Sequence, residues 1–284
     1  MDIQAVLNEY DGFYARNDPE GAYAFICGKI AEARDAGAWQ PELTMLNEVI
    51  GYSRKHLMTE EGNAYIARAD EIIAAHGMEN DVAAATTWLN SATCQRAFGN
   101  PERALAYFAK TEAVYRQKME PFDYRYASLY NNMALVYSDI GDYARAEELS
   151  QKAVGILLTD PDSAAELAAT YVSLAVNAAK RAKAAAAESM AAGAEAGDTE
   201  AGGTEAGAQA DGPAKAVFDY TAVPEVREYV SKATALLDPE GEYPDQYYAY
   251  MAMVNSNSLK QLGFAAEAQR LVTRAQDFYA KLRK

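Results

Sequence analysis

The chain has 284 residues, half of them hydrophobic, and a formal net charge of −15 at pH 7. This acidic balance argues against a nucleic-acid surface, which needs clustered Lys and Arg, and against binding to an anionic membrane. No stretch approaches the roughly 20 apolar residues that span a bilayer, and no signal-peptide pattern opens the sequence. Cys27 and Cys94 form neither a disulfide framework nor a metal-ligand spacing. We therefore expect a cytoplasmic protein.

Prolines mark the beginnings of several predicted helices. Pro19, Pro41 and Pro101 are each followed by Glu, which favours the positive end of a helix dipole, and Asp18 and Asn100 are candidate N-caps. Between these marks apolar residues recur every three or four positions, as in amphipathic helices, without strand-like alternation. The pattern predicts an all-α chain of helix pairs at about 2–36, 41–77, 82–118, 124–160, 163–237 and 246–282.

The fifth pair is interrupted. Its first helix is predicted to end near Ala187, and a low-complexity insertion rich in Ala, Gly and Glu follows at about 188–216. These residues include almost no large apolar side chains, so they cannot offset their ordering entropy by burial. The returning helix is predicted to begin near Pro224. The composition predicts a flexible loop, and a switchable flap over a binding surface is the alternative.

Two segments share one template. Trp88, Ala92, Gly99 and Ala104 recur 42 residues later as Tyr130, Ala134, Gly141 and Ala146. Small residues let two helices approach closely, aromatic residues fill the space between neighbours, and Gly permits a tight turn. A fixed period of this kind is typical of a helical repeat array.

These residues resemble the tetratricopeptide repeat. The run from Tyr130 to Tyr137 followed by Gly141 is a near-complete match, and the long period is similar to the subclass typified by kinesin light chain. The resemblance implies a right-handed α-α superhelix, with residues 1–284 forming one solenoid of five to six pairs. It also implies a non-enzymatic protein-interaction module. Such a module binds an extended peptide or protein segment in a concave groove lined by the first helix of each pair.

Asparagines occupy one register of these first helices. Asn47, Asn90 and Asn132 stand at the same place, and Ser173 follows in the next unit. In the resembled family this place faces the groove, where an Asn amide can donate to and accept from a peptide backbone. Solvated helix faces also carry Asn often, so an inherited scaffold is the alternative. The candidate groove comprises Asn47, Asn90, Thr93, Arg96, Asn132, Leu135, Ser138 and Ser173.

No pattern of residues indicates catalysis. The chain has no glycine-rich phosphate loop, and His56 and His76 are its only histidines, too few for a His-based metal site. We expect no enzyme activity, no cofactor and no metal, and a protein or peptide as the partner. Two other functions stay open. One is a regulator acting through a partner, like the long tetratricopeptide arrays of some bacterial peptide-sensing proteins. The other is a scaffold that self-associates through its end faces.

Overall fold

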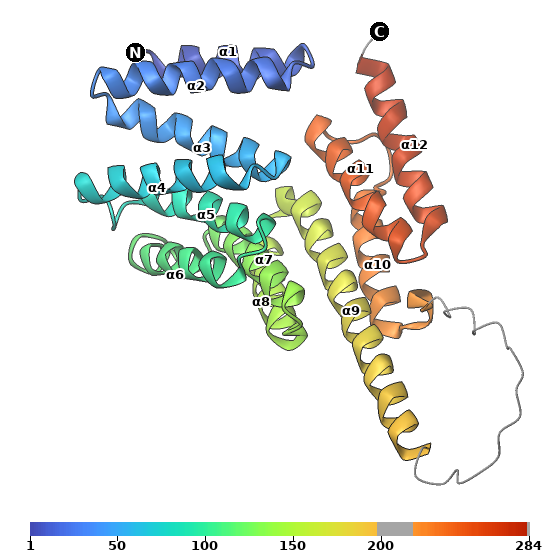
Figure 1. Ribbon diagram of the computed structural model, residues 1–284. Helices are drawn as coiled ribbons and strands as arrows, with labels where there is room; N and C mark the ends of the chain where they lie inside the picture. The colour runs from blue at the N-terminus through green and yellow to red at the C-terminus, as the bar shows by residue number, and fades with distance from the viewer. Residues whose placement is uncertain (198–217, 283–284) are drawn as a thin grey trace, which may run out of the picture. The chain divides into compact units, whose positions relative to one another are not determined.

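The computed structural model describes residues 1–197 and 218–282, and every regular element within them is helical (Figure 1). This confirms the predicted all-α class. Two short 3₁₀ turns, η1 (Pro161–Ser163) and η2 (Tyr220–Ala222), accompany the α-helices. The α-helices are α1 (Ile3–Ala15), α2 (Pro19–Asp35), α3 (Trp39–His56), α4 (Thr59–Ala75), α5 (Val82–Ala97), α6 (Pro101–Lys118), α7 (Tyr124–Asp139), α8 (Tyr143–Leu157), α9 (Ala164–Gly197), α10 (Pro224–Leu237), α11 (Gln246–Gln261) and α12 (Ala265–Leu282).

The contacts divide the chain into two compact units, Met1–Val136 and Tyr137–Lys284, with the boundary inside α7. In the first unit α3 contacts α2, α4 and α5, and α5 packs along α6. In the second unit α9 contacts α8, α10 and α11, and α11 packs along α12. Each unit is therefore built by stacking consecutive helices. The single solenoid over 1–284 stays a prediction.

The beginnings of the helices follow local chemistry. Asp18 accepts a hydrogen bond from the Gly21 amide at 2.9 Å, with Pro19 at the first helical position of α2. Asn100 does not cap α6 as predicted, because its amide donates to the Gln95 side chain at 3.1 Å. Pro41 was predicted to open its helix, but α3 begins at Trp39. Proline is still tolerated there, within the first turn, where the backbone amides lack helical partners.

The template residues form the contacts that their sizes predict. Ala92, Ala104, Ala134 and Ala146 are all buried, as are Trp88 and Phe108. Gly141 has a φ of +85°, a left-handed conformation that favours glycine, between α7 and α8. Close helix packing and the tight turn thus both depend on residue size.

The helix α9 is longer than predicted. It continues to Gly197, ten residues past the expected end near Ala187, and its side chains from Ala187 to Ala192 are exposed. Alanine has the highest intrinsic helix propensity, which favours a helix over residues 187–192 although their side chains are exposed. From residue 198 on, the predicted insertion lies outside the described residues. None of the described helices combines the length and apolarity that a membrane span requires.

Candidate binding face of the first helices

The structure brings the first two predicted asparagines together. Asn90 of α5 donates from Nδ2 to Oδ1 of Asn47 on α3 at 2.9 Å. Asn47 in turn donates to the Leu43 carbonyl oxygen and to the Thr87 hydroxyl, both at 3.0 Å. Both amide protons of Asn47 are therefore used within the fold. Asn47 thus positions Asn90, and Asn90 is the member of the pair with hydrogen-bonding capacity to spare.

A second polar contact lies further along the same two helices. Arg54 of α3 donates from Nη1 to the Thr93 hydroxyl at 3.2 Å, and that hydroxyl donates to the Asn90 carbonyl oxygen at 2.9 Å. Arg54 is exposed, and the repeat pattern does not single it out. Its spacing could have identified it in the sequence, because Arg54 stands seven residues after Asn47, two turns along the same helix face. It places a cation beside the predicted residues.

The helix α7 carries the next part of this register. Asn132 donates from Nδ2 to the Ser128 carbonyl oxygen at 2.9 Å, a bond within its own helix. Within the described part of the chain, the side-chain oxygens of Asn90 and Asn132 accept no hydrogen bond. Leu135 and Arg96 are both half-buried. The first unit therefore offers two amide oxygens, a hydroxyl, an apolar side chain and arginines on its first helices.

The two predicted residues of the second unit differ from these. Ser138 is only 8 % exposed, so we leave it out of the proposed binding face. Ser173 is half-buried on α9, and its hydroxyl donates to the Ala169 carbonyl oxygen at 3.1 Å. It remains a candidate, with one acceptor position open toward solvent.

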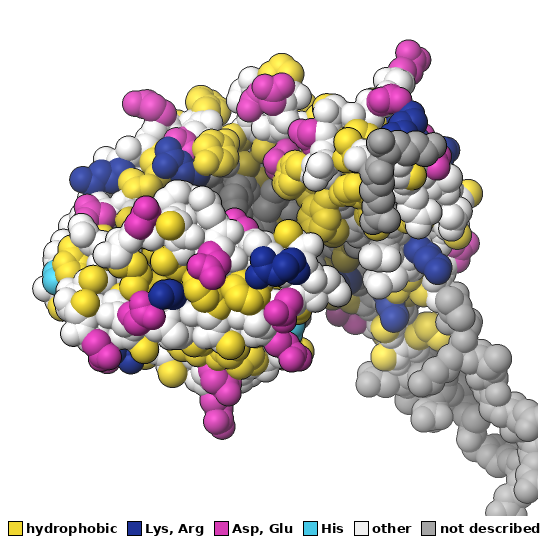
Figure 2. All heavy atoms as spheres, turned by 90° about the horizontal axis from the view of Figure 1, so that it is seen from above, with side chains coloured by type: hydrophobic (Ala, Val, Ile, Leu, Met, Phe, Trp, Pro, Cys, Tyr) yellow, Lys and Arg dark blue, Asp and Glu magenta, His cyan; other side chains and the backbone are white. Residues whose placement is uncertain are grey.

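Charges of both signs are spread over the described surface. On the side of the molecule drawn in Figure 2, Lys and Arg alternate with Asp, Glu and apolar side chains, without a large basic patch. Residues 1–197 and 218–282 contain no group of three or more His, Cys, Asp or Glu side chains that could hold a metal ion. The surface drawn in Figure 2 is thus of mixed charge.

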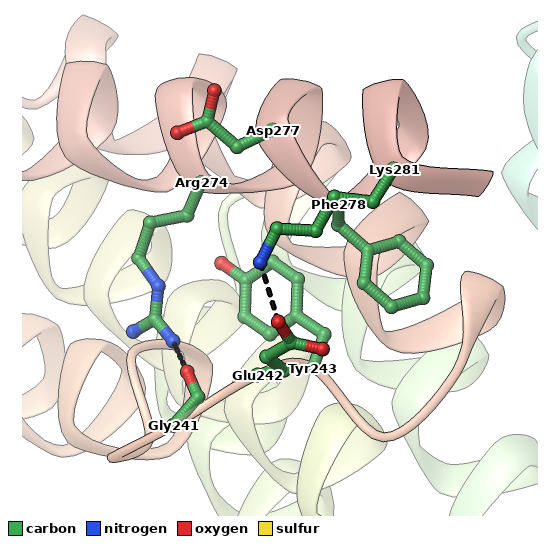
Figure 3. Close-up of a pocket in the computed structure, with 7 residues that line it drawn as sticks. All are labelled: Gly241, Glu242, Tyr243, Arg274, Asp277, Phe278 and Lys281. Atoms are coloured by element: carbon green, nitrogen blue, oxygen red, sulfur yellow. Dashed lines mark hydrogen bonds and ion pairs between the residues drawn. The ribbon is translucent and has the colours of Figure 1, made fainter. Parts of the chain in front are cut away.

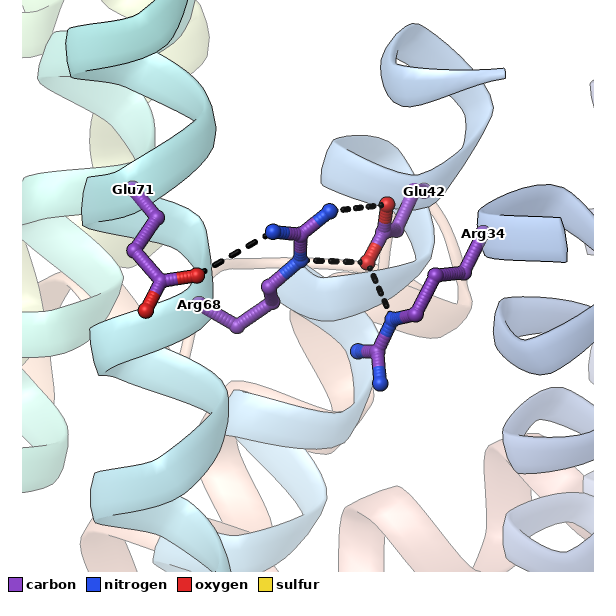
Figure 4. Close-up of polar contacts among 4 residues, drawn as sticks. All are labelled: Arg34, Glu42, Arg68 and Glu71. Atoms are coloured by element: carbon purple, nitrogen blue, oxygen red, sulfur yellow. Dashed lines mark hydrogen bonds and ion pairs between the residues drawn. The ribbon is translucent and has the colours of Figure 1, made fainter. Parts of the chain in front are cut away.

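A buried ion-pair network joins the helices next to this face (Figure 4). The Glu42 carboxylate of α3 is 2 % exposed and receives Arg68 of α4 in a bidentate pair, with N–O distances of 2.8 and 2.9 Å. Arg34 of α2 adds a third contact at 3.0 Å, and Arg68 also pairs with Glu71. The hydrogen bonds from Arg68 and then Arg34 hold the pKa of Glu42 below its usual range, against the opposing effect of burial. The network is structural, because each buried charge is matched.

A small cavity lies between α12 and the connection from α10 to α11 (Figure 3). Its volume is about 160 Å³. Arg274 pairs with Asp238, donates to the Gly241 carbonyl oxygen at 2.6 Å, and lies 4.9 Å from the centre of the Tyr243 ring. Lys281 pairs with Glu242. These pairs neutralise both cations. The side chains around the cavity therefore attach the α10–α11 connection to α12.

The comparisons with known proteins concern the helical-repeat fold. Residues 83–159 match the model of the tetratricopeptide repeat family. No curated protein matches the sequence. Such repeat families are in general interaction modules and not enzymes, and their fold implies protein–protein interaction.

Two solved structures have a similar fold. One is BtubC (BKLC) from P. vanneervenii, with a TM-score of 0.56 and 18 % identity, covering 73 % of this chain and 87 % of that one. The other is a Podospora anserina kinesin light chain protein with nearly identical tetratricopeptide-like repeats. It has a TM-score of 0.51 and 14 % identity, over 86 % of this chain and 97 % of its own. Residues 83–159 therefore carry tetratricopeptide repeats, and the fold of the chain is similar to that of kinesin-light-chain-like repeat proteins.

Proposed function

We propose that the first helices of the first unit bind an extended peptide segment of a partner protein. The proposed face comprises Asn90, Thr93 and Arg96 of α5, Asn132 and Leu135 of α7, and Arg54 of α3, with Asn47 positioning Asn90. Ser173 lies in the second unit and is not part of this proposed face.

The observation that carries this proposal is the Asn90–Asn47 hydrogen bond at 2.9 Å. It joins two helices at the register where the resemblance predicts groove-facing amides, and it fixes the orientation of the Asn90 amide. A fixed amide binds a peptide group at a lower entropic cost than a mobile one. Asn132 continues the register, and its side-chain oxygen is not engaged within the described residues. Two such oxygens can each accept a backbone N–H from an extended chain.

The test is a selection from a phage-displayed library of random 12-residue peptides. Wild type should enrich a set of peptides that Asn132→Ala and the double variant Asn90→Ala/Asn132→Ala fail to retain. Asn8→Ala is the matched control, since Asn8 is exposed on α1 and, among the described residues, bonds only to Gln4 of the same helix. It should enrich the same peptides as wild type.

Thermal unfolding followed by circular dichroism separates binding from stability. Asn132→Ala removes one hydrogen bond within a helix, so we expect a loss of at most about 1 kcal/mol. If all variants retain the wild-type peptides, the Asn face is not the binding face. A large fall in stability would instead give these residues a scaffold role.

A further inference from the structure

The helix α11 carries an apolar stripe that no described residue covers. Tyr247, Tyr250, Met253 and Val254 are 49, 54, 37 and 45 % exposed. Their spacing of three, six and seven residues from Tyr247 places them on one helix face. The opposite face, with Ala249, Ala252 and Leu259, is buried against α9 and α12. A helix that is apolar on both faces is normally covered on both, so the stripe marks an interaction surface.

A hollow borders this stripe. It has a volume of about 480 Å³ and is lined by Met253 of α11 with Gln276, Tyr279 and Ala280 of α12. The Tyr279 hydroxyl donates to the Gln246 carbonyl oxygen at 3.0 Å and so fixes this side of the hollow. The hollow is large enough for one apolar side chain of a partner, next to the Met253 end of the stripe.

The other end of the stripe is acidic. The Glu166 carboxylate of α9 lies near the Tyr247 hydroxyl, and Asp245 caps the start of α11. Burial raises the pKa of Tyr247 to about 12, together with Glu166 and, to a smaller extent, Tyr250 and Asp245. The only cation of α11, Lys260, stands thirteen residues after Tyr247. Two tyrosine rings beside two carboxylates form a surface that attracts an ammonium or guanidinium group.

We propose that this α11 stripe binds a peptide segment of a partner protein in which a Lys or Arg precedes an apolar side chain. The cation lies over Tyr247 and Tyr250, and the apolar side chain packs on Val254 and Met253. Tyr250 and Val254 are about 6 Å apart along the helix axis, which equals two residues of an extended chain. The segment therefore carries its basic residue at position i and its apolar residue at i+2.

Other parts of the same chain fit this stripe less well. Residues 198–217 contain one pair with this spacing, Lys215 and Val217, but four acidic residues against one Lys give the segment a net charge of −3, which the carboxylates beside the stripe disfavour; residues 283–284 are Arg and Lys, without an apolar residue. A second copy of the chain is disfavoured by the net charge of −15, which makes two copies repel, whereas a cationic segment is attracted. The stripe belongs to the second unit and does not depend on the Asn face of the first.

The test uses fluorescein-labelled (Lys-Ser-Leu-Ser)₃, with (Glu-Ser-Leu-Ser)₃ and (Lys-Ser-Ser-Ser)₃ as control peptides. Fluorescence anisotropy should show that wild type binds the first peptide at least about tenfold more tightly than either control. Tyr250→Ala/Val254→Ser should lose this preference. Tyr124→Ala, which removes an exposed tyrosine from α7, should keep it.

Three outcomes overturn the proposal. The double variant could bind the first peptide as tightly as wild type does, or the acidic peptide could bind equally well. Light scattering could also show a dimer that Tyr250→Ala/Val254→Ser dissociates, in which case a second copy covers the stripe. Circular dichroism on each variant confirms that the exposed substitutions leave the fold intact.

Discussion

Arg68 donates two parallel hydrogen bonds to the buried carboxylate of Glu42, from Nε at 2.8 Å and from Nη2 at 2.9 Å. The pair joins α4 to α3, and Arg34 extends it to α2. A charge with 2 % exposure is stable only while its partners remain, since water cannot replace them.

Replacing Arg68 should therefore destabilise the protein strongly. Arg68→Met leaves the Glu42 carboxylate with Arg34 alone, and we expect a loss of roughly 3 kcal/mol in the free energy of unfolding. Urea denaturation at pH 7 measures it. The control is Glu71→Gln, which removes only the exposed partner of Arg68 and should cost less than about 1 kcal/mol. Equal losses in the two variants would contradict the assigned role of Glu42.

The same network should make the free energy of unfolding depend on pH in the acidic range. The pKa of Glu42 is lower in the folded protein than its ordinary value of 4.5, so the folded state favours the ionised form. Its contribution is fully present above the unfolded pKa and is lost as the pH falls below about 4.5 through the folded pKa. The stability difference between wild type and Glu42→Gln should thus shrink from pH 7 to pH 3. A difference that stays constant over this range would show that Glu42 is not ionised in the fold.

The role of Glu42 shows where the sequence stops being informative. By pattern it is an acidic residue in the first turn of a helix, which favours the helix dipole. Its burial depends on Arg34 and Arg68, eight residues before it and twenty-six after it, and only the packing of three helices brings them together. Small buried residues such as Ala92 were predictable because their spacing repeats.

The other differences have equally specific causes. The prediction for the end of α9 considered only burial, whereas the propensity of an alanine-rich segment also favours a helix. Asn100 was a plausible cap, but Gln95 competes for its side chain. The sequence placed Asn47 and Asn90 at one register. The structure adds that the Asn47 amide donates both of its hydrogen bonds within the fold, to the Leu43 carbonyl oxygen and the Thr87 hydroxyl. Side-chain competition of this kind is not encoded in a spacing.

Ala146 provides a test of helix packing. It is 1 % exposed on α8, so Ala146→Leu should overpack the interior and lower the free energy of unfolding by about 1–3 kcal/mol. Ala144 lies two residues earlier on the same helix and is exposed. Ala144→Leu should change stability by less than about 0.5 kcal/mol. Both variants can be compared by urea denaturation, and similar losses would show that the site tolerates a large side chain.

Two glycines of the second unit should respond in opposite directions to the same substitution. Gly141 has a φ of +85° and open space around it, so Gly141→Ala should cost about 1–2 kcal/mol through backbone strain alone. Gly155 lies inside α8, also with open space around it, and Gly155→Ala should stabilise by about 0.5–1 kcal/mol. Thermal unfolding measures whether each variant is more or less stable than wild type. A stabilising Gly141→Ala would contradict the left-handed turn.

Hydrogen bonds between neighbouring repeats join residues that are close in the sequence. The Tyr23 and Tyr65 hydroxyls are 2.7 Å apart across 42 residues, and the Asn47–Asn90 bond spans 43. Each of these two bonds spans about one repeat, so it can form once the neighbouring repeat is present. Chains whose contacts are local fold fast, and in repeat arrays folding can begin at any repeat and spread to its neighbours. During synthesis, each helix pair can therefore become ordered soon after the ribosome releases the pair that follows it.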